Sequence, residues 1–204
     1  MKDPEAANSV SRETYIEATD PKLTYVCIIG SGYVGLTYAA GLSLKGFNVF
    51  LVDIDQSRIN QINNGICPID EPGLQDALAS GIEQGRVKAT TKLGNVFSQS
   101  KVILVCVGTY CDEEGNIDLS QVRAVATSLR ECFRKVSGGN LDYKVICIKS
   151  TVICGTTDGV VKPIIEASGK RAGKDFGLGM SPEFLKEGSA LEDILNPDKI
   201  VIGG

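Results

Sequence analysis

The sequence Gly30-Ser31-Gly32-Tyr33-Val34-Gly35 has the spacing GxGxxG, which is suited to holding phosphate groups. Between a strand and a helix, Gly30 permits a tight turn, Gly32 lets the backbone approach a pyrophosphate, and Gly35 allows close helix–strand packing. The start of such a helix offers free N–H groups and a partial positive charge. The spacing therefore predicts a dinucleotide-binding turn, in which Tyr33 and Val34 also take part.

Asp53 closes the next apolar run, about 20 residues beyond the glycines, where a carboxylate accepts hydrogen bonds from adenosine ribose hydroxyls. A carboxylate there repels a 2′-phosphate, so we expect NAD as the cofactor and not NADP. Arg58 has two readings: it could hold a phosphate or stack on adenine, or it could be a solvated helix charge. Asp53 also has an alternative reading as a turn or helix-capping residue, but the complete unit favours cofactor binding.

These residues need a framework of strand, turn and helix. Apolar runs at 23–29 and 48–53 predict buried strands, and the spacing over 34–45 predicts the helix between them. Asp55 is expected to cap a helix that runs to about residue 63. Short joins between such elements indicate a βαβ unit. We therefore predict an α/β fold, a Rossmann-type doubly wound, mainly parallel sheet with helices on both faces.

The remaining chain predicts further elements of both kinds. Strands are expected at 87–91, 101–107, 143–150, 176–180 and 199–202, and helices at 72–83, 119–135, 154–168 and 182–188. Pro163 is expected to kink the third of these helices, and residues 137–140 to end the second. We assign residues 1–22 to a polar N-terminal tail, with a short helix near 11–17, and residues 23–204 to the NAD-binding domain.

Composition excludes several classes of function. The net charge of the 204 residues is −4, which disfavours a nucleic-acid partner, and no apolar run is long enough for a membrane span. The seven cysteines lie in apolar runs or lack metal-site spacing, so we expect no metal and a reducing, cytoplasmic setting. The absence of histidine excludes histidine-based acid–base chemistry within these residues.

The glycine-rich sequence in its form Gly-x-Gly-Tyr-Val-Gly resembles that of the UDP-glucose/GDP-mannose dehydrogenase family. Later blocks agree in order and spacing: Val52-Asp53-Ile54-Asp55, residues 64–74 (NGICPIDEPGL), Lys149-Ser150-Thr151-Val152, residues 181–188 (SPEFLKEG) and residues 196–203 (NPDKIVIG). The resemblance covers the chain from residue 23 to its end. It is greatest to the NAD-binding domain of the UDP-glucose 6-dehydrogenase branch.

The resemblance implies an activity and roles for particular residues. Family members oxidise the C6 hydroxyl of a nucleotide sugar twice, as in the conversion of UDP-glucose and two NAD+ to UDP-glucuronate and two NADH. Thr151 is implied to position a catalytic water near the nicotinamide, and Glu183 to act in acid–base steps of thioester hydrolysis. Glu187 is implied to support the same pocket. Since they are four residues apart, the two glutamates are expected on one helix face; without the resemblance we would read them as an exposed pair.

The sequence departs from the family in two loops beside the cofactor. The usual Val-x-Thr-Pro is here Val107-Gly108-Thr109-Tyr110, and the usual Pro-Pro is Ile153-Cys154. Val107, Gly108 and Thr109 are still expected to contact the cofactor, although the lost proline predicts a less rigid loop.

The family's catalytic cysteine, lysine and asparagine fall beyond Gly204, so we expect a truncated chain that does not itself turn over substrate. Cys154 is the cysteine that we place nearest the nicotinamide, and we interpret it as a loop substitution. Dimerisation of the complete enzyme is implied to depend on the missing part. Alternatives remain open: a stand-alone NAD-binding or sensor domain, or a dehydrogenase of GDP-mannose or of a UDP-N-acetylhexosamine.

Overall fold

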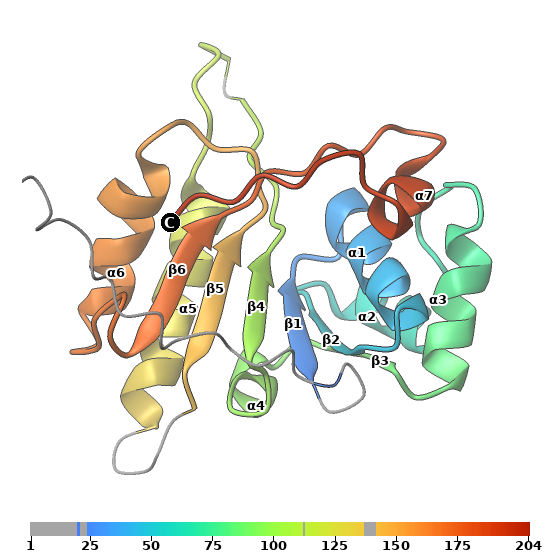
Figure 1. Cartoon of the computed structure of the whole chain (residues 1–204), viewed down its shortest axis with the longest axis horizontal. Coiled ribbons are helices and arrows are strands. Elements are labelled where there is room, and N and C mark those ends of the chain that lie inside the picture. Colours follow the sequence, from blue (N-terminus) through green and yellow to red (C-terminus); the bar gives the residue numbers. More distant parts are fainter. Residues whose placement is uncertain (1–19, 21–23, 112, 137–141) are drawn as a thin grey trace, which may run out of the picture.

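A computed structural model of the chain describes residues 20, 24–111, 113–136 and 142–204. Its centre is a six-stranded sheet in which all neighbouring strands are parallel, in the order β3-β2-β1-β4-β5-β6 (Figure 1). The strands are β1 (Tyr25–Ile29), β2 (Asn48–Val52), β3 (Val87–Thr90), β4 (Val102–Val105), β5 (Lys144–Ile148) and β6 (Phe176–Met180). The order runs outward from β1 in one direction and from β4 in the other, which confirms the predicted doubly wound sheet.

Helices cover both faces of the sheet. They are α1 (Tyr33–Leu44), α2 (Gln56–Asn63), α3 (Leu74–Glu83), α4 (Leu93–Phe97), α5 (Ser120–Lys135), the π-helix η2 (Thr157–Val161), α6 (Lys162–Glu166) and α7 (Ala190–Leu195). One core cluster joins the sheet to α5 and α6, and the other joins it to α1 and α3. Helix α7 packs on α1 (Figure 1).

Strand β1 shows why the sequence makes a sheet that is buried on both faces. Cys27 and Ile29 belong to the cluster with α5, whereas Val26 and Ile28 belong to the cluster with α1. Because successive side chains point to opposite faces, a strand covered on both sides is a continuous apolar run. The runs predicted as strands at 23–29, 48–53, 87–91, 101–107, 143–150 and 176–180 all form strands, with ends that differ by a few residues.

The first βαβ unit follows the expected pattern closely. Helix α1 begins directly after the glycine-rich turn, and β2 pairs with β1 in parallel from Tyr25 and Asn48 onward. The side chain of Asp55 accepts hydrogen bonds from the backbone N–H groups of Ser57 and Arg58, at 2.9 and 3.1 Å. This confirms Asp55 as the N-cap of α2.

The prediction of a helix at 182–188 is wrong. Residues 182–186 form no regular element, residues 187–189 form a turn, and α7 begins at Ala190. The Glu183 side chain accepts a hydrogen bond from the N–H of Leu185, at 2.8 Å, which is a local alternative to helical bonding. Gly188 has φ of +90°, which ends any helix before it. The expectation that Glu183 and Glu187 share a helix face is therefore also wrong.

The prediction of a strand at 199–202 is wrong as well. Residues 199–202 form no strand, and the residue after them, Gly203, makes an antiparallel bridge to Met180 with N–O distances of 2.7 and 2.8 Å. Ile200 and Ile202 are exposed. An apolar run forms a strand only where the backbone groups of a partner strand continue beside it.

The helix expected at 154–168 is shorter and less regular than predicted. It begins as η2 at Thr157 and becomes α6 at Lys162, with Pro163 in the first turn of α6. Proline lacks an N–H and crowds the carbonyl group one turn back. The predicted kink thus takes the form of a wider π turn before Pro163.

Smaller differences concern three other segments. Helix α3 begins at Leu74 after Gly73 in the left-handed conformation, so Pro72 precedes the helix. The short α4 was not predicted. Residues 1–19 and 21–22 of the expected tail, including the helix near 11–17, lie outside the described residues, as do residues 137–140. In the part of the chain that the structure describes, no helix is long and apolar enough to cross a membrane.

Candidate cofactor and substrate site

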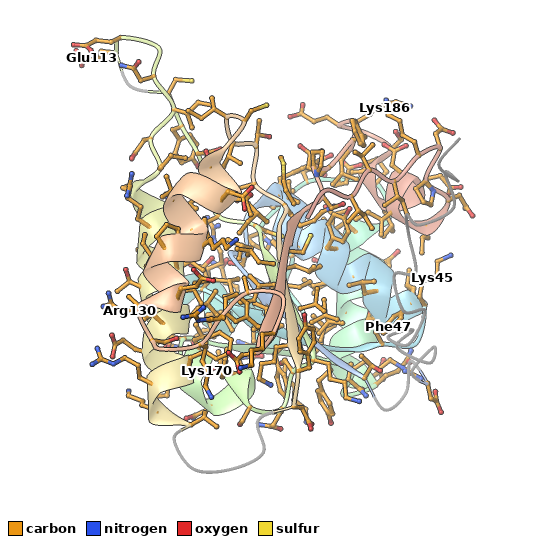
Figure 2. The ribbon with its side chains drawn as sticks, turned by 60° about the vertical axis from the view of Figure 1, so that its left-hand side comes forward. Lys45, Phe47, Glu113, Arg130, Lys170 and Lys186 are labelled. Carbon is orange, nitrogen blue, oxygen red and sulfur yellow. The ribbon has the colours of Figure 1, made fainter. Side chains whose placement is uncertain are left out.

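A cavity of about 680 Å³ lies at the carboxyl edge of the sheet, where β1 and β4 adjoin. This edge, at the switch in strand order, is where open α/β sheets bind ligands. Figure 2 shows Glu113 and Lys186 at the end of the molecule where the strands finish, and Phe47 and Lys170 where they begin. Predicted site residues in the lining are Gly30, Gly32, Tyr33, Val34, Asp53, Arg58, Val107, Gly108, Thr109, Thr151 and Glu183. Of the described residues that we predicted, Gly35 and Glu187 lie outside it.

The glycine-rich turn has the geometry of a phosphate cradle. Gly30 has φ of +102°, and a Cβ there would lie 2.6 Å from the carbonyl oxygen of Cys106. A Cβ on Gly35 would overlap the carbonyl oxygen of Gly30. In contrast, a Cβ on Gly32 would meet nothing within 4 Å. Gly32 is also the N-cap of α1 and makes no side-chain cap bond, so the open space adjoins a helix start that suits a pyrophosphate.

Asp53 is held in place by the turn itself. Its Oδ2 accepts hydrogen bonds from the N–H and the hydroxyl of Ser31, at 2.7 and 2.6 Å, and its Oδ1 accepts one from the N–H of Asp55, at 3.0 Å. Burial alone would raise the pKa of Asp53. The bonds from Ser31 and Asp55, with the nearby Arg58 guanidinium, outweigh burial and lower its pKa. The carboxylate is therefore ionised and keeps unused lone pairs that can accept further hydrogen bonds.

The sequence left two interpretations of Arg58, a cation that contacts the cofactor and a solvated helix charge. Its Nη1 donates to the carbonyl oxygen of Ser31, at 3.3 Å, and the side chain lines the cavity. The guanidinium is thus attached to the glycine-rich turn and is not a free surface charge.

The two loops that depart from the family pattern are joined to each other. The hydroxyl of Thr109 donates to the carbonyl oxygen of Thr151, at 2.7 Å, and that of Ser150 donates to the carbonyl oxygen of Val107, at 2.6 Å. The ring of Tyr110 lies so close to Gly108 that a Cβ there would be 2.8 Å from it. These hydrogen bonds join the 107–110 loop to the backbone of the 150–151 loop.

The segment that carries Glu183 reaches the cavity without being helical. Ser181 Oγ accepts a hydrogen bond from Lys149 Nζ, at 3.3 Å, and the same ammonium lies 4.6 Å from the ring centre of Tyr38. The buried Lys149 therefore links β5 to the segment and to α1. Glu183 faces the cavity, whereas Glu187 lies in the exposed turn before α7.

The model of the UDP-glucose/GDP-mannose dehydrogenase family, NAD binding domain, matches residues 24–204. The chain belongs to this family. It is 40% identical over 179 residues to the GDP-mannose 6-dehydrogenase of Pseudomonas aeruginosa, and 42% identical over 177 residues to a UDP-glucose 6-dehydrogenase of Haloferax volcanii. These matches cover 87% and 86% of the chain but 40% of each relative, so the chain spans less than half of their length.

A solved structure in the family agrees with the fold. The ternary complex of GDP-mannose dehydrogenase from Pseudomonas aeruginosa superposes with a TM-score of 0.83, over 87% of this chain and 40% of that one. A UDP-glucose dehydrogenase from Pyrobaculum islandicum superposes with a TM-score of 0.81 at 32% identity. The chain is thus a NAD-binding domain of a nucleotide-sugar dehydrogenase family. Relatives with different sugar nucleotides match it about equally well.

Cys154 is placed differently from our expectation. Cys154 is exposed and outside the cavity lining, whereas Cys106 is part of that lining. Burial raises the pKa of Cys106 far above the ordinary thiol range, and the nearby Lys149 only partly opposes this. Since a thiolate and not a thiol is the nucleophile, Cys106 is in an unreactive state. Among the described residues no group of His, Cys, Asp and Glu is arranged to hold a metal.

Sequence reasoning missed two residues that shape the site. Ser31 lies inside the glycine-rich sequence, but only the fold shows its hydroxyl on Asp53. Lys149 belongs to a family block, yet its contacts come from α1 and from residue 181, far away in sequence. A small polar residue between the two glycines is the single local signal that pointed toward Ser31.

Proposed function

We propose that residues 23–204 form the NAD-binding part of a nucleotide-sugar 6-dehydrogenase that oxidises UDP-glucose at C6. One observation carries this proposal: a single cavity has Asp53 in its lining together with Thr151 and Glu183. The family's cofactor supplies hydride transfer when it is bound. An acidic ribose-binding residue and polar groups for the reacting end thus share one space at the switch point of the sheet.

Each residue would make a separate contribution. Asp53 accepts hydrogen bonds from the adenosine ribose, and the first turn of α1 donates to the pyrophosphate. Thr151 holds a water beside the reacting carbon through its hydroxyl. Glu183 exchanges a proton with that water, a role for which geometry matters before pKa. Glu187 supports this end of the pocket indirectly, since it lies in the turn that follows.

The cofactor assignment is tested by calorimetric titration of the 204-residue chain with NAD+ and NADP+. We expect NAD+ to bind and NADP+ to bind much more weakly, because the Asp53 carboxylate repels a 2′-phosphate. Asp53→Ala should weaken NAD+ binding by about 1–3 kcal/mol, as expected for hydrogen bonds to a charged group. Equal affinity for the two cofactors would contradict the proposal.

The identity of the sugar is tested on an enzyme that includes the remaining length found in relatives. We expect NADH production with UDP-glucose, and we expect that enzyme to be a homodimer in sedimentation. GDP-mannose is the second candidate, because a GDP-mannose 6-dehydrogenase is 40% identical to the chain. NADH production with GDP-mannose alone would replace UDP-glucose in the proposal. A stand-alone NAD sensor would be indicated by tight cofactor binding without turnover of any nucleotide sugar.

We expect the 204-residue chain to bind NAD+ but not to oxidise UDP-glucose by itself. The second oxidation requires a covalent sulfur adduct, and Cys106 is held as a thiol while Cys154 lies outside the cavity. The measurement is NADH absorbance with UDP-glucose present. Turnover that is abolished by Cys154→Ser would show that this exposed cysteine reaches the substrate.

A further inference from the structure

The carboxylate of Glu71 accepts hydrogen bonds from two segments that are distant from it in sequence. Its Oε2 accepts hydrogen bonds from the Tyr33 hydroxyl, at 2.8 Å, and from the N–H of Gly188, at 3.0 Å. Its Oε1 accepts a bond from the N–H of Ala190, at 2.8 Å. Glu71 is only 6% exposed, although it belongs to the loop between α2 and α3. A carboxylate so enclosed by donors is fixed in position.

These bonds connect the cofactor turn to the segment that carries Glu183. Tyr33 is the first residue of α1 and lines the cavity, and its hydroxyl also lies 3.5 Å from the carbonyl oxygen of Lys186. Gly188 lies in the turn before α7, and Ala190 is the first residue of that helix. Glu71 itself is absent from the cavity lining, so any effect on the site must pass through Tyr33 or through the 183–190 segment.

The protonation states agree with this arrangement. Backbone donation from Gly188, followed by the bond from Tyr33 and that from Ala190, lowers the pKa of Glu71 despite its burial. Burial and the adjacent Glu71 raise the pKa of Tyr33 far above its ordinary value. At neutral pH the pair is therefore a carboxylate accepting from a phenol.

The 183–190 segment depends on such an anchor because it contains no helix or strand before Ala190. Its local bonds, among them those from the N–H of Leu185 to Glu183, from the N–H of Lys186 to Asp193 and from the N–H of Ser189 to the Lys186 carbonyl, stay within the segment and α7. Glu71 is the acceptor that joins it to the loop before α3.

We propose that Glu71 is a positioning residue that couples the occupancy of the cofactor site, through Tyr33, to the placement of residues 183–190. The inference rests on the proposed cofactor contact of Tyr33. If cofactor binding favours the docked segment, then thermodynamic linkage requires the docked segment to favour cofactor binding by the same factor. Loss of the Glu71 carboxylate should therefore weaken NAD+ binding although Glu71 lies outside the cavity.

The test compares the 204-residue chain with Glu71→Gln, Tyr33→Phe, the double variant and Glu192→Gln. Glu192 is a matched control, because it lies exposed on α7 and, among the described residues, its side chain accepts a bond from Asn196 alone, at 2.7 Å. Calorimetry measures the Kd for NAD+, and hydrogen exchange measures the amides of residues 186–190 with and without NAD+.

We expect Glu71→Gln to raise the Kd about tenfold, the scale of a hydrogen bond to a charged group. Glu192→Gln should leave the Kd within about twofold, as expected for an exposed site. The double variant should bind little worse than Glu71→Gln, because partners in one interaction are not additive. NAD+ should slow exchange at 186–190 in the unaltered chain and in Glu192→Gln, but not in Glu71→Gln or Tyr33→Phe.

A Glu71→Gln chain with a lower Tm but an unaltered Kd and unaltered NAD+-dependent exchange would overturn the inference and leave Glu71 a purely structural residue. If Glu71→Gln does not fold, Tyr33→Phe decides, since it keeps the bonds to Gly188 and Ala190. Absence of NAD+ binding to the unaltered chain would refute the proposed function and this inference together. Binding of NAD+ without any response at 186–190 would refute the inference alone.

Discussion

At the scale of residues, the three glycines of the cofactor turn are required for different reasons. Gly30 needs its left-handed conformation, and Gly35 lies where a Cβ would overlap a carbonyl oxygen. Gly32 has free space around it, so the fold itself does not require a glycine there. Its space is the one that a pyrophosphate would occupy. A substitution at Gly35 should therefore affect mainly stability, whereas one at Gly32, three residues away, should affect mainly NAD+ binding.

We predict that Gly35→Ala lowers the free energy of unfolding by about 3 kcal/mol or more, since overpacking against backbone cannot relax easily. Gly32→Ala should fold with nearly unaltered stability, yet lose most NAD+ binding because the new Cβ fills the cradle. Urea unfolding and calorimetry on both variants separate these effects. The prediction fails if Gly32→Ala binds NAD+ normally.

Ser31 offers a second prediction at this scale. Ser31→Ala removes the hydroxyl that donates to Asp53 Oδ2 at 2.6 Å while keeping the backbone N–H bond. We expect NAD+ binding to weaken by about 1 kcal/mol, because Asp53 is then less well oriented. Calorimetry measures the change. Ser57→Ala on the neighbouring α2 serves as the control, because Ser57 donates its backbone N–H and not its hydroxyl to the capping residue Asp55.

At the scale of elements, a glycine in α1 sets how closely α7 approaches. A Cβ on Gly41 would lie 2.6 Å from Cγ2 of Ile194 in α7. Gly94 in α4 has nothing within 4 Å of the same position. The same substitution at the two helical glycines is therefore expected to have opposite effects on the stability of the chain.

We predict that Gly41→Ala destabilises the chain by about 1–3 kcal/mol through overpacking. Amide exchange should speed up most in 190–195, because α7 is short and is displaced first. Gly94→Ala should stabilise the chain by about 0.5–1 kcal/mol through helix propensity. Thermal unfolding with hydrogen exchange checks both, and equal effects at the two sites would contradict the packing argument.

The elements that the sequence predicts well are those in which local pattern and tertiary environment agree. The continuous apolar run of β1 and the Asp55 cap of α2 each carry their own signal, and both form as predicted. The 182–188 segment carries a helix-like spacing, yet the N–H of Gly188 donates to Glu71, which lies 117 positions away in sequence. The roles of Ser31 and Lys149 likewise depend on distant partners, which no local pattern encodes.

At the scale of the whole molecule, buried thiols predict how stability changes with pH. Burial raises the pKa of the Cys27 thiol from 9.0 to about 12, and it also raises the pKa of Cys106, Cys132 and Cys147. Above pH 9 the unfolded chain loses these protons while the folded chain keeps them. The contribution of these thiols to the free energy of unfolding should therefore be complete below pH 9 and should fall as the pH rises toward 12.

We expect the free energy of unfolding to fall between pH 8 and pH 10, and Cys27 alone should account for roughly 1 kcal/mol of this decrease. Burial lowers the pKa of Lys144, which acts in the opposite sense: its contribution to stability rises with pH until the unfolded lysine is neutral. Urea unfolding at several pH values measures the slope. Cys27→Ala should reduce it, whereas Cys111→Ala, at an exposed position, should not.

The bond between Glu71 and Gly188 joins residues that are 117 positions apart. At translation rates of about 5–20 residues per second, the ribosome makes Gly188 on the order of ten seconds after Glu71. The glycine-rich turn and Asp53 precede Glu71, and the ribosome completes β3 and β4 in the first part of that interval. A nascent chain thus contains the glycine-rich turn, Asp53 and the strands β1 to β4 for several seconds before the segment with Glu183 is made.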